Sequence, residues 1–308
     1  MTANRQKNPP YDEQHTLRTG HFMEQLVEAT DRGFETGALV PIPTSSIEYE
    51  EAGLSFQLRK IEALKRKEAA KAIQVASKEI PRPPRNPFLP YEKDLFVADL
   101  SETHVAVLNK FRVIAHHFLI LTRDFERQTS ALTLTDIWAA TLCLQQLDGL
   151  VFYNGGEAAG ASQPHKHLQM IPFPLTETAA FPMQRVWRDG DLQDSRLQDL
   201  PFVHAFARLS LDTERETKVC AELLFETYLS LMQRVGLSLE EEEVSPYNLL
   251  LSRGGMMVVP RRQEFCEGIS VNALGFAGAL LGRDQQQVEH IRDIGAIRLL
   301  TEVGYTEL

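Results

Sequence analysis

The sequence predicts an α+β fold, and three features of the 308-residue chain support this class. Short apolar segments rich in Val, Ile, Leu and Phe follow one another between residues 94 and 125, which is typical of strands. A segment at 217–235 repeats large apolar side chains at helical spacing. Two further strand-like segments, 247–253 and 256–261, are joined by Gly254-Gly255, a pair that favours a hairpin turn.

Composition and charge narrow the range of functions before any motif is considered. Hydrophobic residues make up 43% and charged residues 24% of the chain, enough for a sizeable core in one or two domains. The formal net charge of -10 argues against a general binder of DNA or RNA, although a locally basic cleft can still hold an anion. The polar N-terminus and the lack of a long apolar stretch predict neither signal peptide nor membrane helix, so the cytoplasm is the expected compartment.

The three cysteines are far apart in the sequence, at positions 143, 220 and 266. A scattered, odd set without a C-x-x-C pair argues against a disulfide framework and against a zinc site built from cysteines. We therefore expect Cys143, Cys220 and Cys266 to be small buried apolar side chains.

The elements expected before residue 94 are one helix, one strand and two segments of unusual composition. A helix is predicted over 11–37, and a short strand over 54–58. The basic run 59–73 is rich in good helix formers and predicts an exposed helix. The segment 80–90 holds five prolines and predicts a linker or an extended wrap over the surface.

From residue 94 onward the predicted elements form two strand-and-helix series. In the first, the run Thr133-Leu134-Thr135-Asp136 offers N-cap candidates for a helix through 137–147. The other predictions are strands at 94–100, 104–111, 118–125, 150–154 and 165–173, with a small-residue loop at 155–164. After an irregular connection at 174–215, the second series consists of the helix 217–235, the hairpin 247–261 and closing helices at 273–282 and 284–303. The order of strands and then helix in 94–148 and 247–303 suggests two related halves.

The segment 162–169, SQPHKHLQ, is where the chemistry is expected. On a strand, alternate side chains share a face, so His165, His167 and Gln169 project to one side. They follow a glycine- and serine-containing loop whose backbone N–H groups can approach an anion. Three polar side chains in a row thus form one reactive surface.

Three interpretations of these histidines stay open on the pattern alone. They can lie on a solvated edge strand without a role. They can be the His-x-His pair of a metal site, completed by His104, His116 or His117. In the third interpretation, a neutral imidazole attacks phosphorus while an acceptor holds its other ring nitrogen and fixes the tautomer.

The segment GASQPHKHLQ resembles the signature of the H-x-H-x-Q transferase branch of the histidine-triad superfamily. An ordered set of further segments resembles the ATP adenylyltransferase family, the diadenosine tetraphosphate phosphorylases: LNKF at 108–111, LVFYNGG at 150–156, SPYNLLLSRGGMMVVPR at 245–261 and GISVNALGFAGALLGRD at 268–284. The resemblance runs from about residue 50 to the C-terminus. It implies a histidine-triad-like antiparallel sheet with packed helices, whose second half is a related, degenerate unit.

The resemblance also implies a role for each matching residue. His167 would be the nucleophile that forms a nucleotidyl-histidine, His165 would orient it, and Gln169 would bond a phosphoryl oxygen. The positions that match substrate contacts of the family are Lys67, Asn109, Lys110, Asn154, Gly160, Ala161, Ser162, Gln163, Asn272, Ala273, Leu274, Ala279 and Arg283. Lys65 and Lys60 are the neighbouring alternatives to Lys67. Arg283 stands where lysine is expected, and Ala279 where a methionine is expected.

The predicted organisation is an N-terminal helical segment at 1–50, a catalytic region at 51–215 and a C-terminal region at 216–308. The predicted function is phosphorolysis of diadenosine tetraphosphate to ATP and ADP, with the reverse adenylyl transfer. The alternatives are a hexose-1-phosphate uridylyltransferase, a histidine-triad hydrolase and a non-catalytic nucleotide-binding protein. The expected partners are these nucleotides and phosphate. No tightly bound cofactor or structural metal is expected, with Mg²⁺ considered as a charge-neutralising companion of the polyphosphate.

Overall fold

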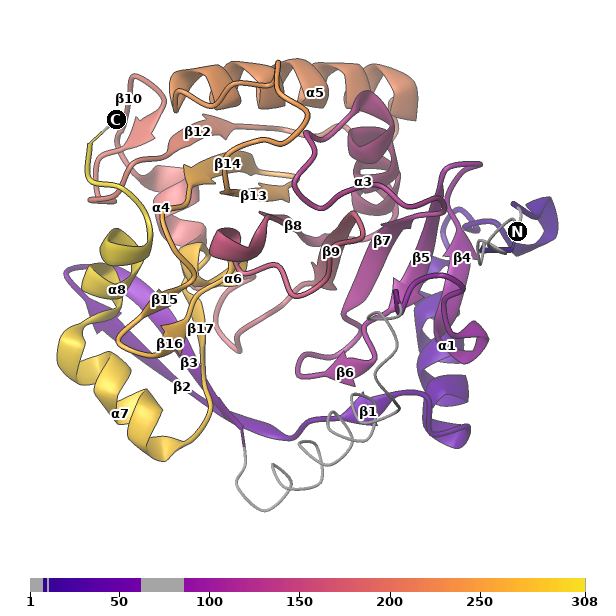
Figure 1. Cartoon of the computed structure of the whole chain (residues 1–308), viewed down its shortest axis with the longest axis horizontal. Helices are drawn as coiled ribbons and strands as arrows, with labels where there is room; N and C mark the ends of the chain where they lie inside the picture. Colours follow the sequence, from indigo (N-terminus) through magenta and orange to yellow (C-terminus); the bar gives the residue numbers. More distant parts are fainter. Residues whose placement is uncertain (1–7, 10, 62–85, 308) are drawn as a thin grey trace, which may run out of the picture.

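A computed structural model describes residues 8–9, 11–61 and 86–307 of the chain. Its centre is one antiparallel sheet of eight strands in the order β12-β14-β13-β8-β9-β7-β5-β4 (Figure 1). The strands of this sheet are β4 (Phe96–Asp99), β5 (His104–Leu108), β7 (Phe118–Thr122), β8 (Gly149–Gly155), β9 (His167–Pro172), β12 (Ala205–Arg208), β13 (Tyr247–Ser252) and β14 (Gly255–Pro260). The α+β class predicted from the sequence is confirmed.

Helices cover one face of this sheet. The face is packed by α1 (Phe22–Glu35), α3 (Leu134–Gln146) and α5 (Thr217–Arg234), and α3 contacts α5 directly. Alternate residues of the two central strands, among them Val151, Leu168 and Met170, are buried in the core beneath these helices. Because side chains alternate along a strand, the odd-numbered residues of β9 lie on the opposite face.

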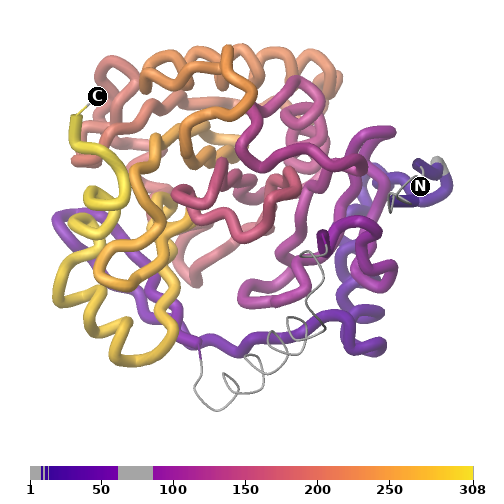
Figure 2. The backbone as a smooth tube through the Cα atoms, viewed as in Figure 1, coloured from indigo at the N-terminus to yellow at the C-terminus, as the bar shows by residue number. Residues whose placement is uncertain are grey.

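The opposite face supports a second layer built from both ends of the chain. It contains a three-stranded sheet in the order β17-β3-β2, in which β17 (Ala279–Gly282) pairs in parallel with β3 (Leu54–Ile61), and β3 pairs antiparallel with β2 (Thr44–Glu51). The helices of this layer are α4 (Gln184–Asp189), α6 (Ala273–Phe276), α7 (Gln285–Ile294) and α8 (Ala296–Val303). Figure 2 shows the N-terminal strands lying beside the C-terminal segment that contains β17.

The remaining elements are short. The paired strands are β1 (Val40–Pro41) with β6 (Phe111–Arg112), β10 (Leu192–Gln193) with β11 (Arg196–Leu197), and β15 (Phe265–Cys266) with β16 (Ile269–Ser270). The 3-10 turns are η1 (Glu13–His15), η2 (Lys93–Leu95) and η3 (Glu157–Ala159). No helix within the described residues is both long and apolar enough to span a bilayer.

The central sheet consists of two units with the same order of elements. One unit runs β7, α3, β8, β9 and the other runs β12, α5, β13, β14, and the two meet where β8 pairs with β13. The related halves predicted from the sequence are therefore present, but the second half begins at β12 and ends at β14. The prediction that it spans 247–303 is wrong, because the segment after β14 belongs to the other layer.

Most predicted elements are present, and α3 begins with the expected cap. The Thr133 side chain accepts from the Asp136 N–H, and the Asp136 carboxylate accepts in return from the Thr133 N–H, which satisfies two unpaired donors at the helix start. The three cysteines are buried and unpaired, as predicted. The N-terminal helix is shorter than predicted, because it begins only at Phe22 and Gly37 follows it in the left-handed region at φ 73°.

Several local predictions are wrong. Residues 59–61 continue β3 instead of starting a helix, and the rest of that run to residue 73 lies outside the described residues. The irregular stretch 174–215 contains α4 and the edge strand β12. The hairpin turn is Arg253-Gly254, since Ser252 pairs with Gly255. Residues 279–282 form a strand, and the last helical stretch divides at Gly295.

Competition between local propensity and packing explains the strand at β17. Ala-Leu-Leu is a good helix-forming sequence, but Gly278 just before it has φ 90°, a backbone conformation that ends the helix. A side chain at Gly278 would also meet the Ser55 carbonyl oxygen at 2.8 Å. The chain is therefore directed along β3, where the free edge of that strand supplies hydrogen-bond partners.

Candidate active site

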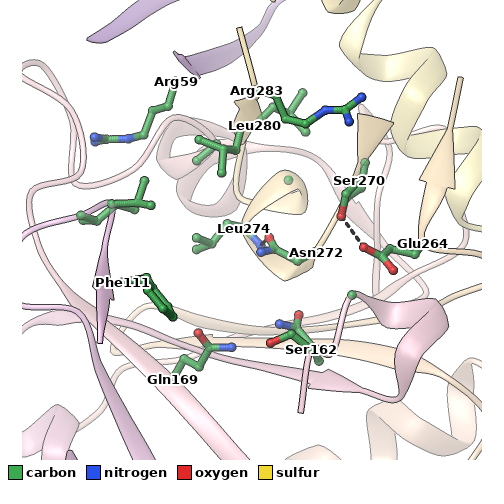
Figure 3. Close-up of a pocket in the computed structure, with 18 of the residues that line it drawn as sticks. Arg59, Phe111, Ser162, Gln169, Glu264, Ser270, Asn272, Leu274, Leu280 and Arg283 are labelled. Atoms are coloured by element: carbon green, nitrogen blue, oxygen red, sulfur yellow. Dashed lines mark hydrogen bonds between the residues drawn. The ribbon is translucent and has the colours of Figure 1, made fainter. Parts of the chain in front are cut away.

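A cavity of about 440 Å³ lies on the face of the central sheet that faces the β17-β3-β2 layer. Figure 3 shows Gln169 and Ser162 on one wall, Arg59 and Leu280 on the opposite side, and Asn272 and Leu274 between them. Of the residues predicted from the sequence, the cavity is lined by Asn109, Asn154, Gly160, Ser162, Gln169, Asn272, Leu274, Ala279 and Arg283. Segments that are far apart in the sequence thus meet at one site.

Other predicted residues lie next to the cavity or outside the described part of the chain. Lys110 pairs with Glu92 at 2.5 Å, and Ala273 donates its backbone N–H to Asn154. Ala161 and Gln163 belong to the loop that precedes β9 but do not line the cavity. Lys60 is on β3, where its ammonium group donates to Gln285. Lys67 and Lys65 lie outside the described residues.

His167 is a buried, neutral histidine with one free ring nitrogen. Its Nδ1–H donates to the backbone carbonyl oxygen of His165 at 2.8 Å, which fixes the tautomer and leaves Nε2 unprotonated. Burial lowers the pKa of His167 to about 4, so the ring is uncharged at neutral pH. Among the described residues, no hydrogen-bond partner occupies Nε2, which is the arrangement that a nucleophilic imidazole needs.

The contact between His165 and His167 comes from the main chain of His165, while its side chain bonds other segments. The sequence predicts that His165 orients His167, but its main-chain oxygen makes that contact, and any residue supplies this atom. The imidazole donates from Nε2 to the Thr122 carbonyl and accepts at Nδ1 from Asn86, each at 2.9 Å. Phe88, two residues after Asn86, packs its ring against both His165 and His167. The His165 side chain therefore holds the segment 86–88 against His167.

Lys166, the residue between the two histidines, is held on the opposite side of the segment by two acidic side chains. Lys166 is fully buried beneath α3 and bonds Asp136 at 2.9 Å and Glu126 at 2.8 Å. Burial opposes the charge of Lys166, but the two carboxylates outweigh it and raise its pKa. Asp136 also accepts from His104. These contacts fix the position of the residue between the two histidines.

Two amide side chains on the cavity wall are held so that their N–H groups face inward. The Oδ1 of Asn154 accepts from Asn248 Nδ2 and from the Ala273 backbone N–H, both at 2.9 Å. The Oε1 of Gln169 accepts from His117 at 2.9 Å. With both carbonyl oxygens occupied from behind, each amide has its NH₂ group left for the cavity. The wall is therefore a set of donors suited to an anion.

The charge of the cavity also differs in sign from that of the whole chain. Its charged lining residues are Arg59, Arg283 and Glu264, and with neutral histidines they sum to +1. Glu264 is bonded to Ser270 at 2.5 Å at the far end (Figure 3). Apolar side chains between the charged groups offer a surface for a flat ring, and they include Phe111, Ile114, Leu274 and Leu280.

Several residues of the site were not predicted from the sequence. Arg59 sits within a basic run that predicts an exposed helix. The sequence indicates His117 only as an alternative metal ligand, and no motif around it indicates a contact with Gln169. Gln128 is buried and bonds the backbone on both sides of the site: its Oε1 accepts from the His167 N–H at 2.8 Å, and its Nε2 donates to the Asn154 carbonyl at 2.9 Å. These contacts depend on how distant segments pair, for example β7 with β9. The sequence alone does not show this pairing.

Gly160 is required by both backbone conformation and space. Its φ is 87°, and an added Cβ would lie 2.8 Å from the Asn272 Cβ. We expect Gly160→Ala to lower the unfolding free energy by about 1–3 kcal/mol more than Gly53→Ala. Gly53 is the matched control, because it has φ 81° and nothing within 4 Å. Urea unfolding of the two variants measures the difference, and equal stabilities would contradict the close approach of Gly160 to Asn272.

Two buried histidines, His167 and His204, and the partly buried His117 make stability depend on pH. Burial lowers the pKa of His117, His167 and His204 to about 4, against an ordinary value of 6.5. The unfolded chain therefore binds protons first as pH falls, so this stability is complete above 6.5 and is lost toward 4. Each group contributes up to about 3 kcal/mol. Urea unfolding at pH 7.0, 5.5 and 4.5 should show a steep decline, and a flat profile would contradict neutral burial.

The chain matches two family descriptions along its length. Residues 12–189 match the Ap4A phosphorylase N-terminal domain, and residues 198–306 match the ATP adenylyltransferase C-terminal domain. The division of the chain at residues 50 and 215 stays a prediction.

Two proteins of Saccharomyces cerevisiae are similar in sequence. Protein APA1 is 31% identical over 213 residues, which cover 63% of this chain and 65% of that protein, slightly less than two thirds of its length. Diadenosine 5',5'''-P1,P4-tetraphosphate phosphorylase 2 is 31% identical over 242 residues, which cover 68% of this chain and 72% of that protein.

Solved structures of a yeast enzyme share the fold. The crystal structure of yeast Ap4A phosphorylase Apa2 in complex with AMP has a TM-score of 0.77 at 23% identity, covering 95% of this chain and 99% of that one. The same enzyme in complex with Ap4A has a TM-score of 0.75 at 22% identity, covering 94% and 99%. The two matched domains, which span most of the sequence, show that the chain belongs to the Ap4A phosphorylase family.

Proposed function

We propose that this chain cleaves diadenosine tetraphosphate with inorganic phosphate to give ATP and ADP, and that it also catalyses the reverse transfer. The observation that carries the proposal is His167 on β9, held neutral and in one tautomer two residues before Gln169, which lines a cavity whose wall presents N–H donors. Among the described residues, no hydrogen-bond partner occupies Nε2 of His167. Family membership supports the same reaction.

In the first step, Nε2 of His167 attacks the α-phosphorus of the bound dinucleotide. A phosphorus–nitrogen bond forms, the bond from this phosphorus to its bridging oxygen breaks, and ATP leaves with that electron pair. The ring gains positive charge in this step. The Nδ1–H bond to the His165 carbonyl, 2.8 Å long in the free enzyme, becomes charge-assisted and stabilises the adenylyl-histidine.

In the second step, an oxygen of inorganic phosphate attacks the same phosphorus. The phosphorus–nitrogen bond breaks, His167 returns to its neutral form, and the product is ADP. Gln169 contacts the phosphoryl oxygens but has no titratable group, so it cannot act as a general base for water near neutral pH. A phosphate dianion is already charged and needs no deprotonation to attack.

The substrate-binding roles predicted from the sequence form part of the proposal. Asn154, Ser162 and Gln169 would bind phosphoryl oxygens, and Asn272 and Leu274 would contact the nucleoside among the apolar side chains. The other proposed contacts are Asn109, Gly160, Ala161, Gln163, Ala273, Ala279 and Arg283, together with Lys67 and Lys110. Support comes from the cavity, whose net positive lining and apolar walls suit a nucleotide.

Product analysis across a phosphate titration tests the function. We expect cleavage to require phosphate and to give ATP and ADP with ping-pong kinetics, because the first product leaves before the acceptor attacks. AMP as the main product at saturating phosphate would assign the chain to hydrolysis instead. A stable complex with the dinucleotide and no products would show that the chain is a non-catalytic nucleotide-binding protein.

A further inference from the structure

Three side chains from separate segments form a hydrogen-bond chain that ends at Gln169. His117 Nε2 lies 2.9 Å from Gln169 Oε1, and its Nδ1 lies 3.3 Å from Asn109 Nδ2. The three residues come from the end of β5, the residue before β7, and β9. All three line the cavity. The backbone joins the first two as well, because the Asn109 N–H donates to the His117 carbonyl at 2.9 Å.

The donors and acceptors in this series of hydrogen bonds are set at Asn109, the residue farthest from Gln169. The backbone N–H of Phe111 donates to Asn109 Oδ1 at 3.3 Å, so Asn109 turns its NH₂ group toward His117. Nδ1 of His117 must then accept, which places the proton of the neutral ring on Nε2. Nε2–H donates to Oε1 of Gln169. The only orientation that satisfies every contact leaves the Gln169 NH₂ group for the cavity.

The surroundings keep His117 in this form. Burial lowers its pKa to about 4, so the ring stays neutral and Nδ1 keeps its lone pair for Asn109. The ring also packs against Phe152, at 5.7 Å between centroids, on the strand next to β9. Phe152 pairs directly with Gln169 across the two strands. The imidazole is thus held in place from two sides.

We propose that His117 is a positioning residue for adenylyl transfer, which acts by holding Gln169 so that its N–H donors and not its carbonyl oxygen face the phosphoryl group. The inference rests on the proposed function, since it assigns the group that Gln169 meets. A glutamine without this partner can turn its carbonyl oxygen toward the phosphoryl oxygens, where like partial charges repel. His117 itself does not exchange a proton with the substrate.

Kinetics of a set of variants tests the role. We expect His117→Ala to lower kcat by about tenfold to a hundredfold, with a smaller effect on KM, because a misplaced donor weakens the transition state most. His117→Gln places an amide N–H near the same position and should recover most of the loss. An unchanged kcat in His117→Ala, at wild-type melting temperature, would overturn the proposal.

A double-mutant cycle separates positioning from a structural role. In a Gln169→Ala background, His117→Ala should change kcat by no more than about twofold, because the group through which it acts is gone. A second full loss in that background would show that His117 acts independently of Gln169 and would overturn the proposal. Thermal unfolding of each variant accompanies the kinetics.

A spectroscopic measurement keeps this inference separate from the proposed function. The ¹⁵N shifts of the histidine side chains in the full chain report which ring nitrogen carries the proton. We expect His117 to be protonated at Nε2 alone at pH 7. Protonation at Nδ1 would overturn the proposed hydrogen-bond chain from Asn109 to Gln169, even if the enzyme is active. Wild-type enzyme that forms no ATP and ADP with phosphate would contradict the function, while the tautomer would still report on the hydrogen-bond chain.

Discussion

His167→Ala is expected to abolish nucleotidyl labelling of the protein and to lower turnover by several orders of magnitude. Among the described residues, no hydrogen-bond partner occupies Nε2 of His167, which lies on β9 two residues before Gln169, a residue that lines the cavity. Removal of a nucleophile leaves only binding and electrostatic contributions to the rate. The measurement is trapping with substrate labelled in the adenosine α-phosphate, at neutral or alkaline pH because the phosphorus–nitrogen bond is acid-labile.

Two comparison variants sharpen this result. His165→Ala keeps the backbone carbonyl that orients His167, so we expect labelling to persist with a smaller loss of turnover. His204→Asn alters a buried histidine with the same kind of Nδ1 bond to the carbonyl two residues earlier, but outside the cavity. It should affect stability and leave labelling in place. Retention of most activity in His167→Ala would refute the covalent mechanism.

The second large effect is expected from Gln169→Glu. The two side chains have the same shape, and the carboxylate can still accept from His117, but it presents a negative oxygen to the phosphoryl group where Gln169 presents an N–H donor. Loss of one preorganised donor costs about 10²–10³-fold in kcat, and the added repulsion should make this variant worse than Gln169→Ala.

Steady-state kinetics with a charge control checks this prediction. Gln198→Glu adds the same negative charge at an exposed position outside the cavity and should leave kcat unchanged. If Gln169→Glu were as active as Gln169→Ala, the side chain would not be the donor that faces the phosphoryl oxygens. Full activity in both Gln169 variants would remove this residue from the mechanism.

The sequence predicted the strand that carries His167 and Gln169 because its signals are local. Alternation alone places His167 and Gln169 on one face, and the apolar residues between them bury the other face. Propensity and capping likewise predicted α3 and α5, whose packing agrees with their local preferences. Family resemblance predicted the distant segment around Asn272, which periodicity could not connect to the site.

The residues that escaped prediction depend on contacts between segments far apart in the sequence. His117 has a role only because β7 pairs with β9, which brings its ring to Gln169. Arg59 reaches the cavity because β3 extends further than its composition suggests and pairs with β17. The tautomer of His167 depends on a main-chain oxygen, an atom that is the same for every residue type.

The two-unit sheet contains one copy of the H-x-H-x-Q segment among its strands. A dimer of two identical units would have two equal centres, each with its own reactive strand. Here one chain contains both units, and the strand of the second unit that corresponds to β9 is β14, whose side chains are methionine, valine and proline. This strand has no histidine or glutamine, and its Met257 and Val259 side chains are part of the hydrophobic core. Under the proposed mechanism each polypeptide therefore carries one covalently bound nucleotide, and the second unit supports the first as part of the same sheet.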